Sequence, residues 1–185
     1  MRWAVFLDRD GTVNEEVHYL HQAEQLRLLP GAAEAIRLLN ESGIPVFLVT
    51  NQAGIGRGYY DEPAMRAVHS ALEDELAAHG AHLDAIYHCP HHPDAGCACR
   101  KPNPGLLIQA AEEHDIDLEH SFVIGDKASD LEAGVRVGCL PVLVRTGYGA
   151  TEEPESRDRG VRPQYVGHDL LDAARWVLGR SRVRP

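Results

Sequence analysis

Short apolar runs alternate with helical patterns along nearly the whole sequence, and this alternation constrains the fold more than any other feature. The strand-like runs are WAVFLD (3–8), IPVFLVTN (44–51), DAIYHC (84–89), SFVIGD (121–126) and CLPVLVRTG (139–147), with a weaker strand near Tyr165 and Val166. Most of these runs are continuously apolar, which is typical of strands that are buried on both faces.

Helical patterns follow most of these strands. Helices are predicted within 29–43, 61–80, 103–116, 127–138 and 168–179, with Asp61 as an N-cap and Gly43 and Gly80 as stops. Residues 150–163, ATEEPESRDRGVRP, are expected to form a polar loop. Because strand–helix alternation implies crossovers between parallel strands, we predict an α/β fold. It is a Rossmann-like, doubly wound parallel sheet with helices on both faces.

The chain length of 185 residues suits one domain with a sizeable core. We therefore expect residues 1–185 to form a single domain, with residues 180–185 as a flexible tail. No insertion after the first or second strand is long enough for a cap domain, so small loops must shape any pocket. The N-terminus, MRWAVFLDRDG, turns acidic too early for a signal peptide, and no apolar run could cross a bilayer. We expect a monomer in the cytoplasm, without a membrane partner.

The net charge limits the kinds of ligand that the chain can bind. Eighteen basic and 28 acidic residues give a formal net charge of −10, which argues against a broad electrostatic grip on nucleic acid. A small phosphorylated substrate in a local basic pocket remains compatible with it. Only two of the basic residues are lysines, Lys101 and Lys127. They are candidates for positions that require a compact ammonium group.

Polar residues collect where the predicted strands end. The strand ends carry Asp8, Arg9, Asp10, Thr50, Asn51 and Asp126. In open α/β sheets, ligands bind outside the carboxyl ends of the strands, so these side chains are expected to converge on one crevice. Acids at strand ends can also simply cap the following helices. The number of polar residues here, with both lysines nearby in sequence, favours a functional site.

Four motifs in order carry a family resemblance. FLDRDGT (6–12) matches D-x-D-G-T, VTN (49–51) matches a strand that ends in Ser or Thr, and Lys101 in CRKP matches a single lysine ahead of a helix. IGDKASD (124–130) matches the acidic pattern G-D-x-x-x-D. The chain therefore resembles the haloacid dehalogenase superfamily of phosphotransferases.

This resemblance implies a covalent phosphatase mechanism. Asp8 would attack phosphorus and form an aspartyl-phosphate, while Asp10 would serve first as general acid and then as general base. Two acids this close to a phosphate repel each other, so a hard cation such as Mg²⁺ is needed. The resemblance implies that the Mg²⁺ ligands are the carboxylates of Asp8 and Asp126 and the main-chain carbonyl of Asp10, with Asp130 as a supporting acid. The phosphoryl oxygens would accept hydrogen bonds from Thr50, Asn51 and Lys101.

A narrower resemblance covers nearly the whole chain. TNQAGIGRGYY, GDKASD, VLVRTGYG and a Cys/His cluster are similar to the family of heptose 1,7-bisphosphate and histidinol-phosphate phosphatases. This resemblance implies hydrolysis of the 7-phosphate of heptose 1,7-bisphosphate to give heptose 1-phosphate. The candidate substrate-binding residues are Arg9, Glu16, His18, Tyr19, Asn51, Gln52, Arg57, Arg100 and Lys127. For Arg57 and His18, an ordinary place in a surface loop is the alternative.

Three other functions stay open at this stage. A histidinol-phosphate phosphatase would share the reaction, but it would favour a substrate that carries a cation. A polynucleotide 3′-phosphatase is disfavoured by the net charge of −10. A non-catalytic, zinc-stabilised binding module belongs to a different class, and it would have no need of both Asp8 and Asp10.

The Cys/His cluster lies in CPHHPDAGCACRKP (89–102). Side chains two residues apart in an extended segment share a face, so Cys89 pairs with His91, and Cys97 pairs with Cys99. Such a Cys₃His set suits tetrahedral Zn²⁺, and four protein ligands leave no position for a catalytic water. We therefore predict a small structural zinc loop at 89–99 that fixes the direction of the next two residues. A chance thiol cluster and a redox site are the alternatives, although the redox motif C-x-x-C is absent.

Overall fold

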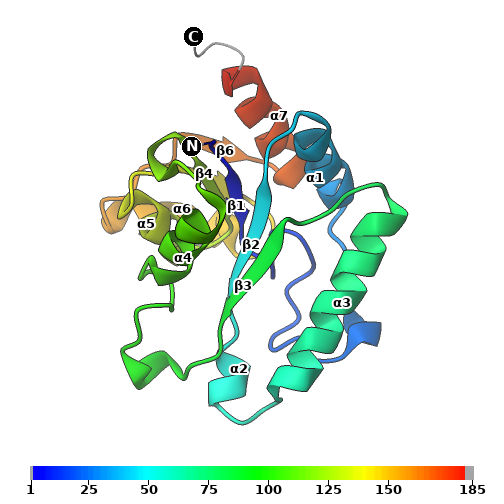
Figure 1. Ribbon diagram of the computed structural model, residues 1–185. Coiled ribbons are helices and arrows are strands. Elements are labelled where there is room, and N and C mark those ends of the chain that lie inside the picture. The colour runs from blue at the N-terminus through cyan, green and yellow to red at the C-terminus, as the bar shows by residue number, and fades with distance from the viewer. Residues whose placement is uncertain (1, 182–185) are drawn as a thin grey trace.

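A computed structural model describes residues 2–181 and confirms the predicted α/β architecture. A six-stranded sheet is formed by β1 (Val5–Leu7), β2 (Val46–Asn51), β3 (Ala85–Cys89), β4 (Phe122–Gly125), β5 (Leu140–Val144) and β6 (Tyr165–Gly167). The strand order is β3-β2-β1-β4-β5-β6, and all neighbouring strands are parallel (Figure 1).

Helices cover both faces of the sheet (Figure 1). One face is covered by α1 (Ala32–Glu41), α3 (Glu62–Ala78) and α7 (Leu170–Ser181), and the other by α4 (Gly105–His114) and α5 (Ala128–Val135). Side chains in β1 alternate between the two cores: Val5 and Leu7 join the first, and Phe6 the second. Four short elements lie in the connections: the helix α2 (Ala53–Gly56) and the 3₁₀ turns η1 (Ala23–Gln25), η2 (Pro93–Ala95) and η3 (Leu118–His120).

The predicted ends of two helices are confirmed. Asp61 precedes α3, and its carboxylate accepts a hydrogen bond from the Ala64 amide at 2.9 Å. Gly43 and Gly80 follow α1 and α3 with φ angles of 72° and 73°, a left-handed conformation that glycine adopts without a steric penalty.

One predicted loop is wrong: much of 150–163 is the helix α6 (Gly149–Asp158). Its sequence has no apolar periodicity and contains Pro154, and both features favour a loop. The helix instead carries two ion pairs between residues four apart, Glu153–Arg157 and Glu155–Arg159. It also packs against α5 and β5. Tertiary packing and local ion pairs therefore outweigh the weak local signal.

The prediction of a flexible tail over residues 180–185 is also partly wrong. Helix α7 extends through Ser181, so residues 180 and 181 are helical rather than part of a tail. The remainder of the expected tail, 182–185, lies outside the described residues. No helix within residues 2–181 combines the length and the hydrophobicity that a membrane span requires.

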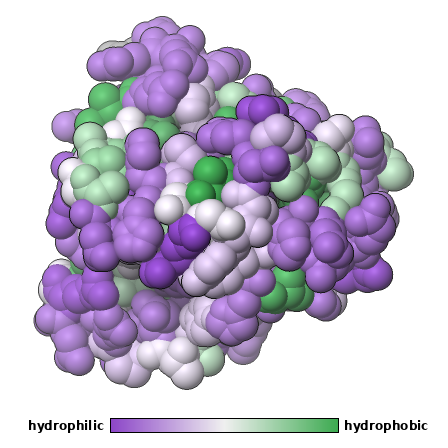
Figure 2. Space-filling model, turned by 90° about the horizontal axis from the view of Figure 1, so that it is seen from below, coloured by the Kyte–Doolittle hydropathy of each residue, from purple (hydrophilic) through white to green (hydrophobic). Residues whose placement is uncertain are grey.

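The sheet topology places the polar strand ends side by side. The chain adds β2 and β3 on one side of β1 and later adds β4 on the other, so the strand order switches at β1. Ligands bind at such switch points in open α/β sheets. Within 2–181, the β1–α1 connection contains only the single turn η1, and the β2–α3 connection contains only α2, so neither connection holds a large cap. Viewed from below, the molecule has a mainly hydrophilic face with scattered hydrophobic residues (Figure 2).

Candidate active site

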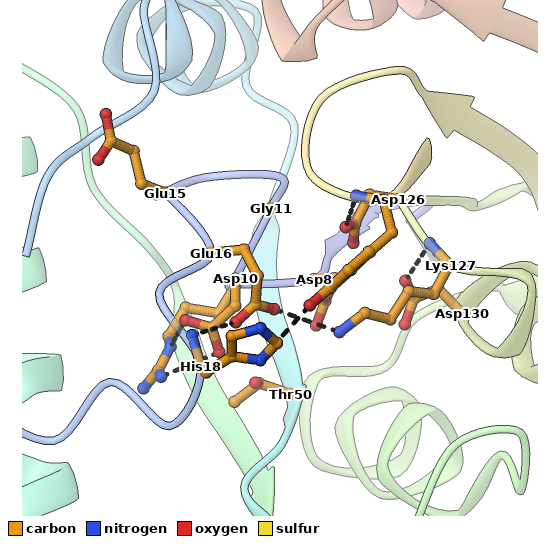
Figure 3. Close-up of polar contacts among 12 residues, drawn as sticks. Asp8, Asp10, Gly11, Glu15, Glu16, His18, Thr50, Asp126, Lys127 and Asp130 are labelled. Atoms are coloured by element: carbon orange, nitrogen blue, oxygen red, sulfur yellow. Dashed lines mark hydrogen bonds and ion pairs between the residues drawn. The ribbon is translucent and has the colours of Figure 1, made fainter. Parts of the chain in front are cut away.

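Three acidic side chains converge beside the ends of β1 and β4. Asp8 follows β1, Asp126 follows β4, and Asp130 lies in the first turn of α5. One carboxylate oxygen from each lies within 4.8 Å of the others. Figure 3 shows these carboxylates gathered together, whereas Glu15 points away from them. The structure thus brings together the acids of the first and fourth sequence motifs.

The environment of Asp126 fits a bound cation. Burial, and then the negative charges of Asp8 and Asp130, raise the pKa of Asp126 to about 9. Its Oδ1 atom is buried and has no hydrogen-bond partner. A Cβ atom on either Gly11 or Gly147 would collide with Asp126 Oδ2, so both positions require glycine. An all-oxygen donor set with an unsatisfied buried oxygen is the environment that Mg²⁺ prefers.

Lys101 bridges two of these acids from the loop before α4. Its Nζ atom donates to Asp8 Oδ1 at 2.8 Å and to the Val49 carbonyl at 2.6 Å, and it forms an ion pair with Asp130 Oδ1 at 2.7 Å. Burial alone would lower the pKa of Lys101, but the charges of Asp130 and Asp8 raise it above its ordinary value. Burial would also raise the pKa of Asp8, but Lys101 and then Lys127 lower it below its ordinary range. Lys101 is therefore charged beside an ionised Asp8.

The end of β2 supports Lys101 and borders the cleft. The Asn51 side chain exchanges two hydrogen bonds with the main chain of Lys101, at 3.0 and 3.1 Å. One hydrogen of the Asn51 amide group is thus bound to the main chain of Lys101, so Asn51 positions Lys101 while it also lines the cleft. Thr50 is buried at the cleft, where its hydroxyl accepts a hydrogen bond from Gln52.

Asp10 is held by donors from three directions. Asp10 Oδ1 accepts from Arg9 Nε at 3.1 Å and from Asn14 Nδ2 at 3.0 Å. Asp10 Oδ2 accepts from Gln52 Nε2 at 3.2 Å and lies 2.9 Å from Arg9 Nη2. In this structure Gln52 therefore contacts a neighbouring acid and Thr50. Its own carbonyl oxygen accepts a hydrogen bond from Tyr60 at 2.6 Å.

The prediction that Arg9 binds substrate is wrong. Its side chain is completely buried and does not line the cleft. The reason lies in the backbone, which turns sharply after β1: the Arg9 carbonyl accepts hydrogen bonds from the amides of Val13 and Asn14. This turn leaves Arg9 beneath the cleft, where its Nη1 atom lies 3.2 Å from His69 Nε2 of α3.

Asp8, Asp10, Asp130 and Lys101 line a cleft of about 450 Å³. Its rim includes the remaining predicted substrate residues Glu16, His18, Tyr19, Arg57, Arg100 and Lys127. Glu16 pairs with Lys127 at 3.4 Å, and the Lys127 ammonium lies 5.0 Å from the ring centre of Tyr148. His18 and Tyr19 adopt left-handed backbone conformations, with φ angles of 48° and 52°. The rim is therefore formed by loops, as expected when neither the β1–α1 nor the β2–α3 connection holds a cap domain.

The Cys/His cluster lies at the adjacent strand, where β3 ends. The Sγ atoms of Cys89, Cys97 and Cys99 are 3.1 to 3.5 Å apart, and His91 Nδ1 lies 3.1 Å from Cys99 Sγ and 3.6 Å from Cys89 Sγ. The edge of a tetrahedron with Zn–S bonds of about 2.3 Å is about 3.8 Å, close to these separations. A disulfide needs about 2.05 Å, so these cysteines are free thiols. The four side chains fit a tetrahedral metal.

The Cys/His loop is tied to the segment that carries Lys101. Asn103 Nδ2 donates to the Cys97 carbonyl at 2.8 Å, and the Gly105 amide donates to the Ala98 carbonyl at 3.0 Å. The Arg100 side chain lines the cleft, and its buried Nη1 atom has no hydrogen-bond partner. These bonds hold the main chain on both sides of Arg100 and Lys101.

Comparison with known proteins agrees with this geometry. Residues 5–85 match a family model described as haloacid dehalogenase-like hydrolase, and residues 98–173 match a HAD-hydrolase-like model. A D-glycero-D-manno-heptose-1,7-bisphosphate 7-phosphatase of Thermosynechococcus vestitus is 43% identical over 187 residues, covering 95% of each chain. The corresponding D-glycero-beta-D-manno enzyme of Yersinia pestis is also 43% identical, covering 97% of each chain. The chain belongs to the haloacid dehalogenase-like hydrolases.

A solved relative extends the agreement to three dimensions. The crystal structure of D,D-heptose 1,7-bisphosphate phosphatase from B. bronchiseptica, complexed with magnesium and phosphate, is 38% identical. It covers 97% of this chain and 99% of its own, with a TM-score of 0.88. The relatives thus match this haloacid dehalogenase-like hydrolase over almost its entire length.

Some residues of this haloacid dehalogenase-like site were missed from the sequence. Tyr148 donates its amide to Asp126 Oδ2 at 2.9 Å and lies in VLVRTGYG, a motif that could have signalled it. Tyr60 supports Gln52, and burial raises the pKa of Tyr60 to about 12. His69 lies on the buried face of α3, among residues of the hydrophobic core. Nothing in its sequence context distinguishes it from an ordinary core residue.

Proposed function

We propose that this chain is a Mg²⁺-dependent phosphatase that removes the 7-phosphate of D-glycero-D-manno-heptose 1,7-bisphosphate and leaves heptose 1-phosphate. The observation that carries the proposal is the buried pair of Asp8 and Lys101 at the base of a cleft rimmed by further cations. The full-length similarity to enzymes named for this reaction supports the substrate.

In the proposed mechanism, an Asp8 oxygen attacks phosphorus and the sugar hydroxyl leaves. Asp10 gives its proton to the leaving oxygen and then removes a proton from the water that hydrolyses the aspartyl-phosphate. The Lys101 ammonium and the Thr50 hydroxyl donate to phosphoryl oxygens, on which negative charge is concentrated in the transition state. Mg²⁺, held by Asp8, the Asp10 carbonyl and Asp126 with support from Asp130, would neutralise the charge of the acids and the phosphate.

The cleft rim supports a substrate with a second anionic group. Arg57, Arg100 and Lys127 line the cleft, and only Lys127 is paired with an acid of the rim, Glu16. The unpartnered Nη1 atom of Arg100 could donate to a phosphate oxygen, since a guanidinium group matches phosphate in geometry. His18 and Tyr19 would contact the sugar. This cationic rim favours a bisphosphate over histidinol phosphate, which carries an ammonium group.

Phosphate release from heptose 1,7-bisphosphate and from histidinol phosphate, measured side by side with Mg²⁺, tests the substrate. We expect kcat/KM to be higher for the heptose bisphosphate. A preference for histidinol phosphate would overturn the substrate assignment while leaving the phosphatase reaction intact. Absence of phosphate release from either compound would contradict the enzymatic function. Action as a monomer and location in the cytoplasm stay predictions from the sequence.

Magnesium is expected to stabilise the fold through Asp126. A ligand that binds only the folded state at 100 times its Kd adds about 2.7 kcal/mol to the free energy of unfolding. We therefore expect saturating Mg²⁺ to raise the melting temperature of the wild-type chain, and to raise that of Asp126→Asn much less. Calorimetry with and without Mg²⁺ measures both, with Asp74→Asn on the exposed side of α3 as a control. An equal Mg²⁺ response of Asp126→Asn and wild type would exclude Asp126 as a ligand.

We further propose that Cys89, His91, Cys97 and Cys99 hold a structural zinc ion. Because four protein ligands complete the coordination, the site would stiffen the loop without joining the reaction. Cys97→Ser is expected to reduce the zinc content from about one ion per chain and to lower the melting temperature. Activity should fall only as far as Arg100 and Lys101 lose their positions.

Elemental analysis and calorimetry of Cys97→Ser check this expectation, with Cys139→Ser as a cysteine control outside the cluster. Cys139 is buried beside α5 rather than in the loop, so its replacement should leave the zinc content unchanged. Removal of zinc from the wild type without any loss of stability would show that the ion is no scaffold.

A further inference from the structure

Arg9 is a buried cation with two side-chain neighbours that bind it from opposite ends. Its Nε and Nη2 atoms face the Asp10 carboxylate, at 3.1 and 2.9 Å, and its Nη1 atom faces His69 Nε2 at 3.2 Å. The Arg9 side chain is fully buried, and His69 is 7% exposed. The hydrogen bonds of Nε and Nη1 hold two edges of the guanidinium group and define its plane, while Nη2 contributes the ion pair with Asp10.

The contact also fixes the protonation of His69. A guanidinium group can only donate hydrogen bonds, so His69 Nε2 must accept and the ring proton must lie on Nδ1. Burial, and then the positive charges of Arg9 and His88, lower the pKa of His69 to about 3. The imidazole is therefore neutral throughout the range in which a phosphatase would work, and its contact with Arg9 is a hydrogen bond rather than an ion pair.

Arg9 links His69 to Asp10, the acid that lines the cleft. Asn14 and Gln52 each give Asp10 a single hydrogen bond, whereas Arg9 faces both of its carboxylate oxygens. Asp10 lines the cleft, whereas none of the lining residues belongs to α3. We propose that His69 is a positioning residue for phosphoryl transfer, which holds the Arg9 guanidinium and thereby the Asp10 carboxylate in the reacting orientation. This inference rests on the acid–base role of Asp10 in the proposed function.

Two substitutions of His69 separate the hydrogen bond from the packing. His69→Leu fills similar space but leaves Arg9 Nη1 buried without an acceptor. Misplacement of a reacting group by about 1 Å costs about 10²-fold in rate, so we expect kcat to fall about 10- to 100-fold. KM should change by less than about threefold, because Asp10 acts on the transition state rather than on substrate binding. His69→Gln places an amide oxygen near the position of Nε2 and is expected to recover most of kcat.

A second substrate gives a readout that a general structural defect would not produce. The p-nitrophenolate group leaves without help from an acid, so the first-turnover burst from p-nitrophenyl phosphate does not need Asp10 as a proton donor. The steady-state rate does need Asp10, as the base that activates water. In His69→Leu we therefore expect a nearly normal burst followed by slow turnover. The control is Val68→Ala, which loosens the same helix but removes no polar partner of Arg9. It should leave the ratio of burst to steady-state turnover as in the wild type.

Three results would overturn the inference. In His69→Leu, these are a kcat equal to that of the wild type, or a burst that is slowed as much as the steady-state turnover. The third is a folded His69→Gln variant that is as slow as His69→Leu. Should the leucine variant fail to fold, His69→Asn takes its place, since its amide is too short to reach Arg9. If the wild type releases p-nitrophenolate but does not hydrolyse heptose 1,7-bisphosphate, the proposed substrate is wrong. The comparison of burst and turnover still decides the role of His69.

Discussion

Asp8→Asn is expected to abolish phosphate release, with a fall in kcat of at least about 10⁴-fold, as is typical when a covalent enzyme loses its nucleophile. The amide keeps the size of the side chain and retains an oxygen toward Lys101 Nζ, which lies 2.8 Å from Asp8 Oδ1 in the wild type. It lacks the negative oxygen that attacks phosphorus. A fixed-time assay of phosphate release with heptose 1,7-bisphosphate and Mg²⁺ measures the effect.

Folding of Asp8→Asn must be verified, because Asp8 is buried among charges. The substitution removes one of three crowded acids, so we expect the variant to keep a cooperative thermal transition. Asp74→Asn, the same chemical change at an exposed position of α3, should retain wild-type kcat. Turnover by a folded Asp8→Asn protein at more than about 1% of the wild-type rate would contradict the covalent mechanism.

Lys101→Met is expected to impair both catalysis and stability. Loss of one preorganised donor to a developing charge costs about 10²- to 10³-fold in kcat. Removal of one partner from a buried ion pair costs about 3–5 kcal/mol, because the remaining charge is left uncompensated. The Lys101 side chain is 5% exposed and lies against two carboxylates, so both penalties apply in full. Steady-state kinetics and urea denaturation measure them separately.

Two further variants define what the ammonium group contributes. Lys101→Arg keeps the charge but brings a larger, planar group into the space among Asp8, Asp130 and the Val49 carbonyl, so it should restore more stability than kcat. Arg66→Met breaks an exposed ion pair with Glu62 on α3 and should change stability by less than about 1 kcal/mol. If Lys101→Met matched this surface control in both kcat and stability, the assigned role of Lys101 would be wrong.

The parts of the site that follow strands directly could be predicted from the sequence. Asp8, Thr50 and Asp126 each stand at the end of an apolar run, and the parallel sheet brings such ends to one edge. The Cys/His loop was also predictable, since the spacing of Cys89, His91, Cys97 and Cys99 sets which side chains share a face.

The remaining features depend on contacts between distant segments. The direction of Arg9 follows from a sharp turn after β1 and from a histidine 60 residues away, and neither leaves a periodic pattern. The pairing of Asn51 with the main chain of Lys101 spans 50 residues. Helix α6 was missed because ion pairs and packing, rather than an apolar stripe, hold it in place. Tertiary structure decides each of these outcomes.

Trapping of the phosphorylated chain tests the central claim most directly. The protein is mixed with Mg²⁺ and heptose 1,7-bisphosphate, quenched in acid during the first turnover, digested and analysed by mass spectrometry. We predict an added phosphoryl group on Asp8, together with heptose 1-phosphate as the released product. Heptose 1-phosphate formed in excess over free phosphate while Asp8 carries no phosphoryl group, or a phosphoryl group on any other residue, would contradict the account.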